Sequence, residues 1–178
     1  VTLFVDGVTT GITTTADATT GIFSLTPLIA LEEGLNSLTV TATDAQGNTS
    51  SASSALSITV DTTAPSAPTF TTADTTTNET IPVISGTAEA GSTVELFNGD
   101  VSLGTTTADG TSGIFSITPS SELSEGLNSL TVTATDAINN VSAASSALSI
   151  TVDTTAPTQP AITTTTTLTS DATPTIEG

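Results

Sequence analysis

The sequence predicts an all-β fold, arranged as tandem β-sandwich repeats of about 92 residues. The clearest observation is the stretch 57–65, which returns letter for letter at 149–157. Within it Ile58 and Val60 alternate with polar residues, which is the pattern of a half-buried strand. Thr, Ser, Ala, Val, Ile and Leu dominate the composition, and this mixture favours strands over helices.

The repeat extends well beyond this stretch and sets the expected domain organisation. Residues 34–45 recur as 126–137, and about four in five positions agree between 13–65 and 105–157. Because repeats of this kind ordinarily occur in arrays, we expect an interior piece of a longer chain. The repeat frame predicts three parts: a truncated module at 1–61 that lacks its first two strands, a complete module at 62–153, and the opening strands of a third module at 154–178.

The complete module should consist of short strands separated by turn residues. The best alternation places Leu130, Val132 and Ala134 on an inner face, and Phe23 and Phe115 are expected in the cores of their modules. Seven short strands in about 90 residues fit an immunoglobulin-like sandwich, although the disulfide, core Trp and corner Tyr of antibody domains are absent. The seven expected strands are 67–72, 81–87, 93–98, 102–107, 114–118, 127–135 and 147–152.

The charge of the chain is extreme and of one sign. Its 178 residues include 18 Asp and Glu and no Lys, Arg or His, for a formal net charge of −18. Such a chain repels phosphates and anionic lipids, so nucleic acid and membrane insertion are not expected. No apolar run is long enough to span a membrane, and no segment has the pattern of a signal peptide. Without His or Cys there is no zinc ligand set, no Ser-His-Asp triad and no thiol nucleophile, so we expect no enzyme.

Three motifs resemble the bacterial Ig-like repeats of giant cell-surface adhesins. They are Thr-Ala-Thr-Asp-Ala at 41–45, Val-Asp-Thr-Thr-Ala-Pro at 60–65 and Ile-Ser-Gly-Thr-Ala-Glu at 84–89. The resemblance implies an extracellular, cell-surface chain whose partners are neighbouring Ig-like modules of the same chain or of other copies. Many relatives bind Ca²⁺ at their domain junctions, and a cell-surface or glycan target would be contacted through other domains.

Carboxylates are expected to gather where one module meets the next. Successive strands of a sandwich run up and down, so the loops after the second, fourth and sixth strands share one end of the module. The exit of the preceding module arrives at the same end. Carboxylates this close repel one another, whereas a Ca²⁺ ion with about 6–8 oxygen ligands would coordinate them and neutralise their charge. The predicted metal ligands are Asp61, Asp136, Glu89 and Asp109 at one junction, with Asp153 serving the next.

A plainer interpretation of these acids stays open. Asp61 can be a turn residue whose side chain caps its own backbone two residues on, Asp109 can belong to a tight turn, and Asp136 can simply start a loop. In the first module, Asp17 is the equivalent of Asp109 and Asp44 is the equivalent of Asp136. The acids at the opposite end are expected to be solvated surface residues, and they are Glu32, Glu33, Glu122 and Glu125.

Two functions compete at this point. The first is a structural stalk or spacer of a surface adhesin, stiffened by Ca²⁺ at its junctions. The alternative is a self-assembling extracellular filament, in which residues 154–178 of one copy complete the truncated first module of the next, since exposed strand edges invite such pairing. A polysaccharide-binding module is a weaker third choice, because the chain has five Phe and no Trp or Tyr.

Overall fold

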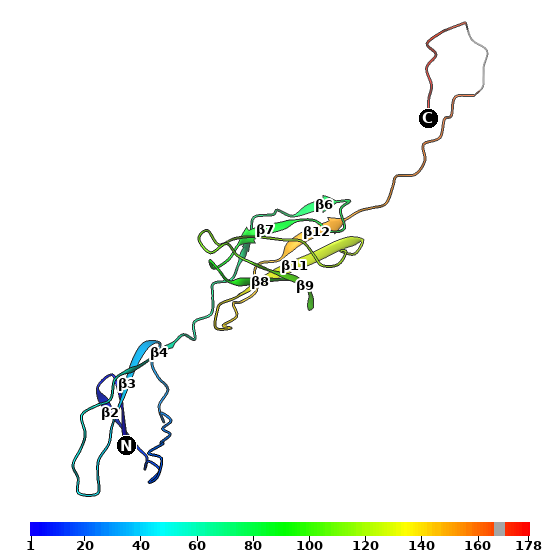
Figure 1. Cartoon of the computed structure of the whole chain (residues 1–178). Helices are drawn as coiled ribbons and strands as arrows, with labels where there is room; N and C mark the ends of the chain where they lie inside the picture. The colour runs from blue at the N-terminus through cyan, green and yellow to red at the C-terminus, as the bar shows by residue number, and fades with distance from the viewer. Residues whose placement is uncertain (166–169) are drawn as a thin grey trace. The chain divides into compact units, whose positions relative to one another are not determined.

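A computed structural model describes residues 1–165 and 170–178, and within them the secondary structure consists of strands without a helix. The chain forms two compact units, shown in Figure 1. Unit 1 comprises Val1–Pro65 and Thr135–Ser142, and unit 2 comprises Ser66–Ala134 and Ala143–Gly178. Across the described residues no helix is long and apolar enough to cross a membrane.

Unit 2 contains two sheets, and this arrangement confirms the predicted all-β sandwich. One sheet has the order β10 (Ile114–Ile117), β7 (Ile84–Thr87) and β5 (Thr69–Phe70). The other has the order β6-β12-β11-β8-β9, in which β6 runs parallel to β12 while the β11–β12 and β8–β9 pairs are antiparallel. Its strands are β6 (Thr75–Thr77), β12 (Leu148–Val152), β11 (Gly126–Thr135), β8 (Thr93–Asn98) and β9 (Val101–Thr107).

The core of unit 2 follows the predicted alternation. Leu130, Val132 and Ala134 of β11 are fully buried, and Phe115 of β10 is buried from the facing sheet. Burial of a Leu, Val or Phe side chain is worth roughly 1.5–3 kcal/mol, so this alternating face stabilises the folded module. The remaining core side chains come from both sheets and include Ile84, Val94, Leu96, Leu103, Leu148, Ile150 and Val152.

One strand of unit 2, β6, was not predicted from the sequence pattern. β6 consists of three threonines with no apolar residue, so it carries no alternation that could mark it. It pairs with β12 through the backbone, with Thr75 opposite Ile150 and Thr77 opposite Val152. The seven expected strands are all present, but the first two are shorter than predicted, at Thr69–Phe70 and Ile84–Thr87.

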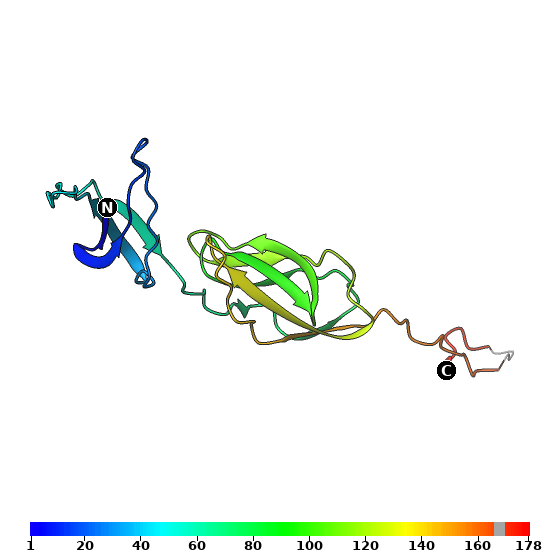
Figure 2. The same cartoon turned by 90° about the horizontal axis from the view of Figure 1, so that it is seen from below.

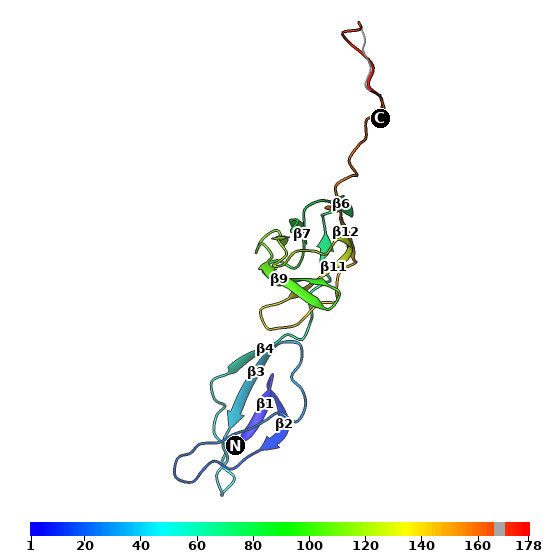
Figure 3. The same cartoon turned by 90° about the vertical axis from the view of Figure 1, so that its right-hand side faces the viewer.

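Unit 1 contains a single sheet with the order β2-β1-β3-β4, and its strands lie side by side in Figure 3. β1 pairs antiparallel with β3, with Leu3 opposite Val40, and Leu3 is buried. This sheet corresponds by the repeat to β8, β9, β11 and β12 of unit 2. Its strands are β1 (Thr2–Val5), β2 (Val8–Thr13), β3 (Gly34–Thr41) and β4 (Leu56–Val60).

The prediction that Phe23 lies in a core is wrong. Phe23 is 43% exposed, whereas its equivalent Phe115 is 2% exposed. Phe115 lies in β10, which is held by β7, but residues 22–25 of unit 1 form no strand (Figure 2). Leu56 is likewise 60% exposed, against 3% for Leu148, because no second sheet covers the face of β4.

A pair of backbone hydrogen bonds near the end of the chain repeats a pair found in the sandwich of unit 2. Thr163 N and Thr164 N both donate to Glu177 O, at 2.8 and 3.2 Å. Thr71 N and Thr72 N donate to Ser85 O in the same way, at 2.9 and 3.2 Å. Residues 166–169, which belong to the predicted opening strands at 154–178, lie outside the described residues.

Candidate functional site

The two repeated exits, where a module's last strand ends, each begin with an aspartate. Asp61 follows β4, and its Oδ1 accepts a hydrogen bond from Thr63 N at 3.0 Å. Asp153 follows β12, and its Oδ1 accepts the equivalent bond from Thr155 N at 3.0 Å. The capping turn considered for Asp61 is therefore present at both exits.

A glutamate at each exit holds the departing chain. Glu33 accepts hydrogen bonds from Thr62 N at 3.2 and 3.1 Å, from Thr62 Oγ1 at 2.8 Å and from Thr63 Oγ1 at 3.2 Å. Glu125 accepts the same four bonds from Thr154 and Thr155, at 3.2, 3.1, 2.7 and 3.2 Å. We call each of these sets an exit clamp.

Strand pairing explains how a glutamate and a threonine 29 residues apart come together. Gly34 at the start of β3 pairs with Val60 at the end of β4, so Glu33 and the residues after Val60 share one end of the sheet. Sequence reasoning expected solvated glutamates here, and both are indeed exposed. It missed the clamp because it did not consider which strand ends pair; the repeated Glu-Gly before one strand and Asp-Thr-Thr after the next was the available signal.

The hydrogen bonds of the clamp favour ionised carboxylates. Bonds from the side chain and backbone of Thr62 hold the pKa of Glu33 below its ordinary value, and the Asp61 side chain adds a smaller lowering. Bonds from the side chain and backbone of Thr154 lower the pKa of Glu125 in the same way. Each exit therefore presents two neighbouring acidic side chains on a chain that offers no basic side chain to neutralise them.

Asp109, another predicted metal ligand, organises a tight turn. Its Oδ1 accepts bonds from Thr111 N at 3.1 Å and from Ser112 N and Oγ at 2.8 Å. The backbone bond from Ser112 is the largest cause of its lowered pKa. Asp17 repeats this turn with Thr19 and Thr20.

Asp136 begins the loop after β11, as its plainer interpretation expects. Its Oδ1 accepts Ile138 N and Asn140 N at 2.9 Å, and its Oδ2 accepts Asn140 Nδ2 at 2.8 Å. Partial desolvation raises the pKa of Asp136, but the bonds from Asn140 and Ile138 outweigh it, so the net pKa is lowered. Asp44 makes the equivalent bonds with Gln46 and Asn48.

The structure brings some of the predicted ligands toward one another. In unit 2 the Glu89 and Asp109 loops are adjacent, since Ala88 N donates to Gly113 O at 2.9 Å and Gly91 N donates to Ala108 O at 3.2 Å. In unit 1 Asn140 Nδ2, already bonded to Asp136, also donates to Asp61 O at 3.2 Å. Among the described residues no group of three or more acidic side chains is close enough to hold a metal ion, so the predicted metal set stays a prediction.

Two sheets packed face to face, strands joined by short turns and acidic exits that recur with the sequence repeat define an immunoglobulin-like modular chain. The chain belongs to the bacterial Ig-like domain family, whose model matches residues 1–62 and 64–154. No curated protein sequence matches it significantly.

Solved structures resemble the chain over most of its length. A Ca²⁺-stabilised adhesin that helps an Antarctic bacterium reach out and bind ice is 30% identical, with a TM-score of 0.50, over 88% of this chain and 40% of that one. The BSP domain of a biofilm-associated protein is 23% identical, with a TM-score of 0.41, over 87% of this chain and 25% of that one. The fibronectin(III)-like modules of Clostridium thermocellum CbhA are 17% identical, with a TM-score of 0.46, over 85% and 76%. The chain thus spans a quarter of the biofilm-associated structure and two fifths of the ice-binding adhesin.

Proposed function

We propose that the chain is a stalk or spacer segment of a bacterial surface adhesin, located outside the cell. The observation that carries this proposal is the exit clamp, which recurs with the same four hydrogen bonds in both modules. A clamp at each exit fixes the direction in which the chain leaves, and a fixed direction is what a spacer needs. The likeness to an adhesin from an Antarctic bacterium supports the same assignment.

The working parts of this spacer are its modules. We take 1–61 as a module without its first two strands, 62–153 as a complete module and 154–178 as the opening of a third. The partners of each are neighbouring Ig-like modules, and a cell-surface or glycan target belongs to other domains. We assign no catalytic role, because a chain without His or Cys can form no Ser-His-Asp triad, no zinc ligand set of the usual type and no thiol nucleophile.

Calcium is the proposed cofactor, and the exits are its proposed location. Asp61 with Glu33, and Asp153 with Glu125, each offer two neighbouring acidic side chains. Hard oxygen donors of this type suit Ca²⁺, which also accepts backbone carbonyls and water. Asp136, Glu89 and Asp109 are the further ligands that we propose for the junction at Asp61. The printed description of the ice-binding relative as Ca²⁺-stabilised supports this assignment.

Small-angle X-ray scattering of the 178-residue chain tests the proposal. We expect a larger maximum dimension and less flexibility in Ca²⁺ than in excess chelator. We further expect Asp61→Asn to remove most of the difference. Asp100→Asn, which changes an exposed acid in the β8–β9 turn, is the matched control and should preserve it. Identical scattering curves in Ca²⁺ and in chelator would show that calcium does not stiffen the chain.

A further inference from the structure

Unit 2 contains the one asparagine of the sequence that is followed by glycine, Asn98 before Gly99. The pair lies where β8 ends and the turn to β9 begins, with Asn98 half-buried and Gly99 exposed. The backbone nitrogen of the next residue can attack an asparagine side chain, and glycine obstructs this attack least because it has no side chain. The chemistry of the sequence therefore favours reaction at Asn98, and the fold decides whether the side chain is free to react.

The side chain of Asn98 is bonded to a buried partner. Its Nδ2 donates to Asn128 Oδ1 at 2.9 Å, and Asn128 is 2% exposed. Asn128 Nδ2 in turn donates to Ser124 O at 2.8 Å, Gly126 O at 3.1 Å and Ile150 O at 3.4 Å. Turning this amide over would set its oxygen against carbonyl oxygens, which cannot donate. Asn128 therefore presents a fixed acceptor to Asn98.

Unit 1 shows that the buried amide keeps this orientation without a partner like Asn98. By the repeat, Asn36 is the equivalent of Asn128 and Val5 is the equivalent of Asn98. Asn36 Nδ2 donates to Glu32 O at 2.8 Å and to Gly34 O at 3.0 Å, and its Oδ1 accepts Glu32 N at 3.1 Å. The strand and the loop before it thus set the orientation, so Asn128 Oδ1 should stay in place when Asn98 changes.

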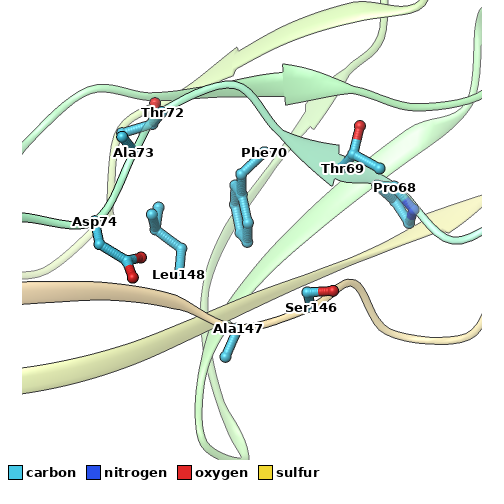
Figure 4. Close-up of a pocket in the computed structure, with 9 residues that line it drawn as sticks. All are labelled: Pro68, Thr69, Phe70, Thr72, Ala73, Asp74, Ser146, Ala147 and Leu148. Carbon is cyan, nitrogen blue, oxygen red and sulfur yellow. The ribbon is translucent and has the colours of Figure 1, made fainter.

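The hairpin of β8 and β9 lies at one edge of its sheet, because β9 is the last strand in the order β6-β12-β11-β8-β9. The opposite edge is held by more than backbone pairing, since Asp74 Oδ1 accepts Ser149 N at 2.8 Å, and Figure 4 shows Asp74 beside Leu148 there. At the β8–β9 turn the bond between Asn98 and Asn128 has this holding role. Turns at a sheet edge open locally at a lower free energy than the core strands do.

We propose that Asn98 is a deamidation site that folded unit 2 protects, and that opening of the β8–β9 turn allows its irreversible conversion. In the open turn Gly99 N attacks Asn98 Cγ, the Cγ–Nδ2 bond breaks, and the proton of Gly99 N leaves with the departing ammonia. Water then opens the resulting succinimide ring at either carbonyl and gives aspartate or isoaspartate, so water is the one reactant consumed. In the closed turn the bond to Asn128 restrains the side-chain rotation that the attack requires.

Either product weakens the closed turn. The aspartate product replaces a donor with a carboxylate facing Asn128 Oδ1, which is also an acceptor, and adds a negative charge to a chain of net charge −18. The isoaspartate product adds a methylene group to the backbone between β8 and the turn, which disturbs the pairing of β8 with β9. Deamidation thus leaves a lasting mark on each module that has opened. The inference does not depend on the stalk proposal or on calcium.

Mass spectrometry of the full 178-residue chain, incubated in native buffer and in guanidinium chloride at the same mildly alkaline pH, tests the proposal. A glutamate-specific protease releases residues 96–122, in which Asn98 is the one asparagine. We expect conversion of Asn98 to be at least about tenfold slower in native buffer, where the fraction of open turns limits it. Asn78, which is exposed and precedes Glu79, is the internal control and should react at the same slow rate in both solutions.

Two variants test the role of Asn128. Asn98→Ala and Asn98→Asp both lose the bond to Asn128 Oδ1, but Asn98→Asp also sets a charge against this oxygen. We therefore expect a lower urea midpoint for unit 2 in Asn98→Asp than in Asn98→Ala.

Three outcomes would overturn the proposal. The first is conversion of Asn98 at equal rates in native buffer and in denaturant, since the fold would then give no protection. The second is no conversion in denaturant, since Asn98 would then be no deamidation site. The third is an Asn98→Asp variant as stable as Asn98→Ala, since the aspartate product would then not weaken the closed turn.

Discussion

Glu33 and Thr62 form the central bond of an exit clamp, with Thr62 Oγ1 donating to Glu33 Oε2 at 2.8 Å. The same bond recurs between Thr154 and Glu125 at 2.7 Å. A carboxylate that accepts several such bonds at once restrains the two residues on which the direction of the linker depends. The restraint belongs to each module by itself, because Glu33 and Glu125 stand immediately before a strand of the sheet whose exit they hold.

Removing the charge of the clamp should loosen the linker without unfolding the module. In Glu125→Gln the side chain keeps its length but loses one acceptor oxygen, so the bonds from Thr154 and Thr155 cannot all form. We expect faster amide hydrogen exchange at Thr154 and Thr155 and unchanged protection of β11. Glu122→Gln, which changes an exposed glutamate three residues earlier in the same loop, is the control. Equal exchange in both variants would show that the clamp does not restrain the linker.

Acidification should destabilise the modules at constant high salt. The pKa of Glu125 is held below its ordinary value of about 4.5, and that of Asp109 below about 3.8. A group whose pKa is lower in the folded state contributes stability above its unfolded pKa, and this stability is lost as the pH falls through the folded pKa. We therefore expect a constant melting temperature from pH 7 to about 5 and a decline below about 4.5.

The measurement is thermal unfolding by circular dichroism in 0.5 M NaCl, because salt suppresses the opposing effect of relieving the general negative charge. Glu125→Gln should show a smaller decline than the parent chain. A melting temperature that rises on acidification would mean that repulsion among carboxylates outweighs their hydrogen bonds.

Gly86 should not tolerate a side chain. A Cβ at this position would collide with Thr69 O of the neighbouring strand β5 and with the ring of Phe115 in the core of unit 2. Overpacking of this kind costs about 1–3 kcal/mol, so Gly86→Ala should lower the denaturant midpoint of unit 2. Gly110→Ala is the control, because nothing lies within 4 Å of its added Cβ. Similar urea midpoints for the two variants would contradict the close packing of β7 on Phe115.

Asn128 should be a structural requirement of β11. It is buried, its Nδ2 donates to Ser124 O at 2.8 Å and Gly126 O at 3.1 Å, and its Oδ1 accepts Asn98 Nδ2 at 2.9 Å. Truncation leaves buried backbone and side-chain groups without partners, which costs about 1–3 kcal/mol per group. We expect Asn128→Ala to destabilise unit 2 by at least that much in urea unfolding, and Asn78→Ala, at an exposed position, to be neutral. A neutral Asn128→Ala would mean that water replaces the lost bonds.

The sequence pattern predicted the fold where burial follows alternation. Leu130, Val132 and Ala134 face the core as expected, because every second residue of a half-buried strand is apolar. β6 could not be found this way, since its threonines contribute backbone pairing alone. Phe23 was misplaced for a different reason: burial depends on a covering sheet, and local pattern does not reveal whether that sheet is present.

In the candidate site too, local features could be predicted from the sequence, whereas contacts between distant segments could not. Local motifs anticipated the turns at Asp61 and Asp109, because an aspartate that caps its own turn needs only its near neighbours. The clamp at Glu33 requires the pairing of Gly34 with Val60, which is a relationship between distant segments. Whether Asp61 and Asp136 share an ion depends on solution conditions as well as on sequence, so that assignment rests on the scattering experiment.

Each repeat brings its own clamp, and this has a consequence for how such proteins change in length. A gene that duplicates one repeat also duplicates the glutamate, the aspartate and the two threonines that orient the new joint. No compensating change is needed elsewhere, since the restraint lies within the copied segment. Recombination can therefore lengthen or shorten the protein in whole steps while every joint keeps the same geometry.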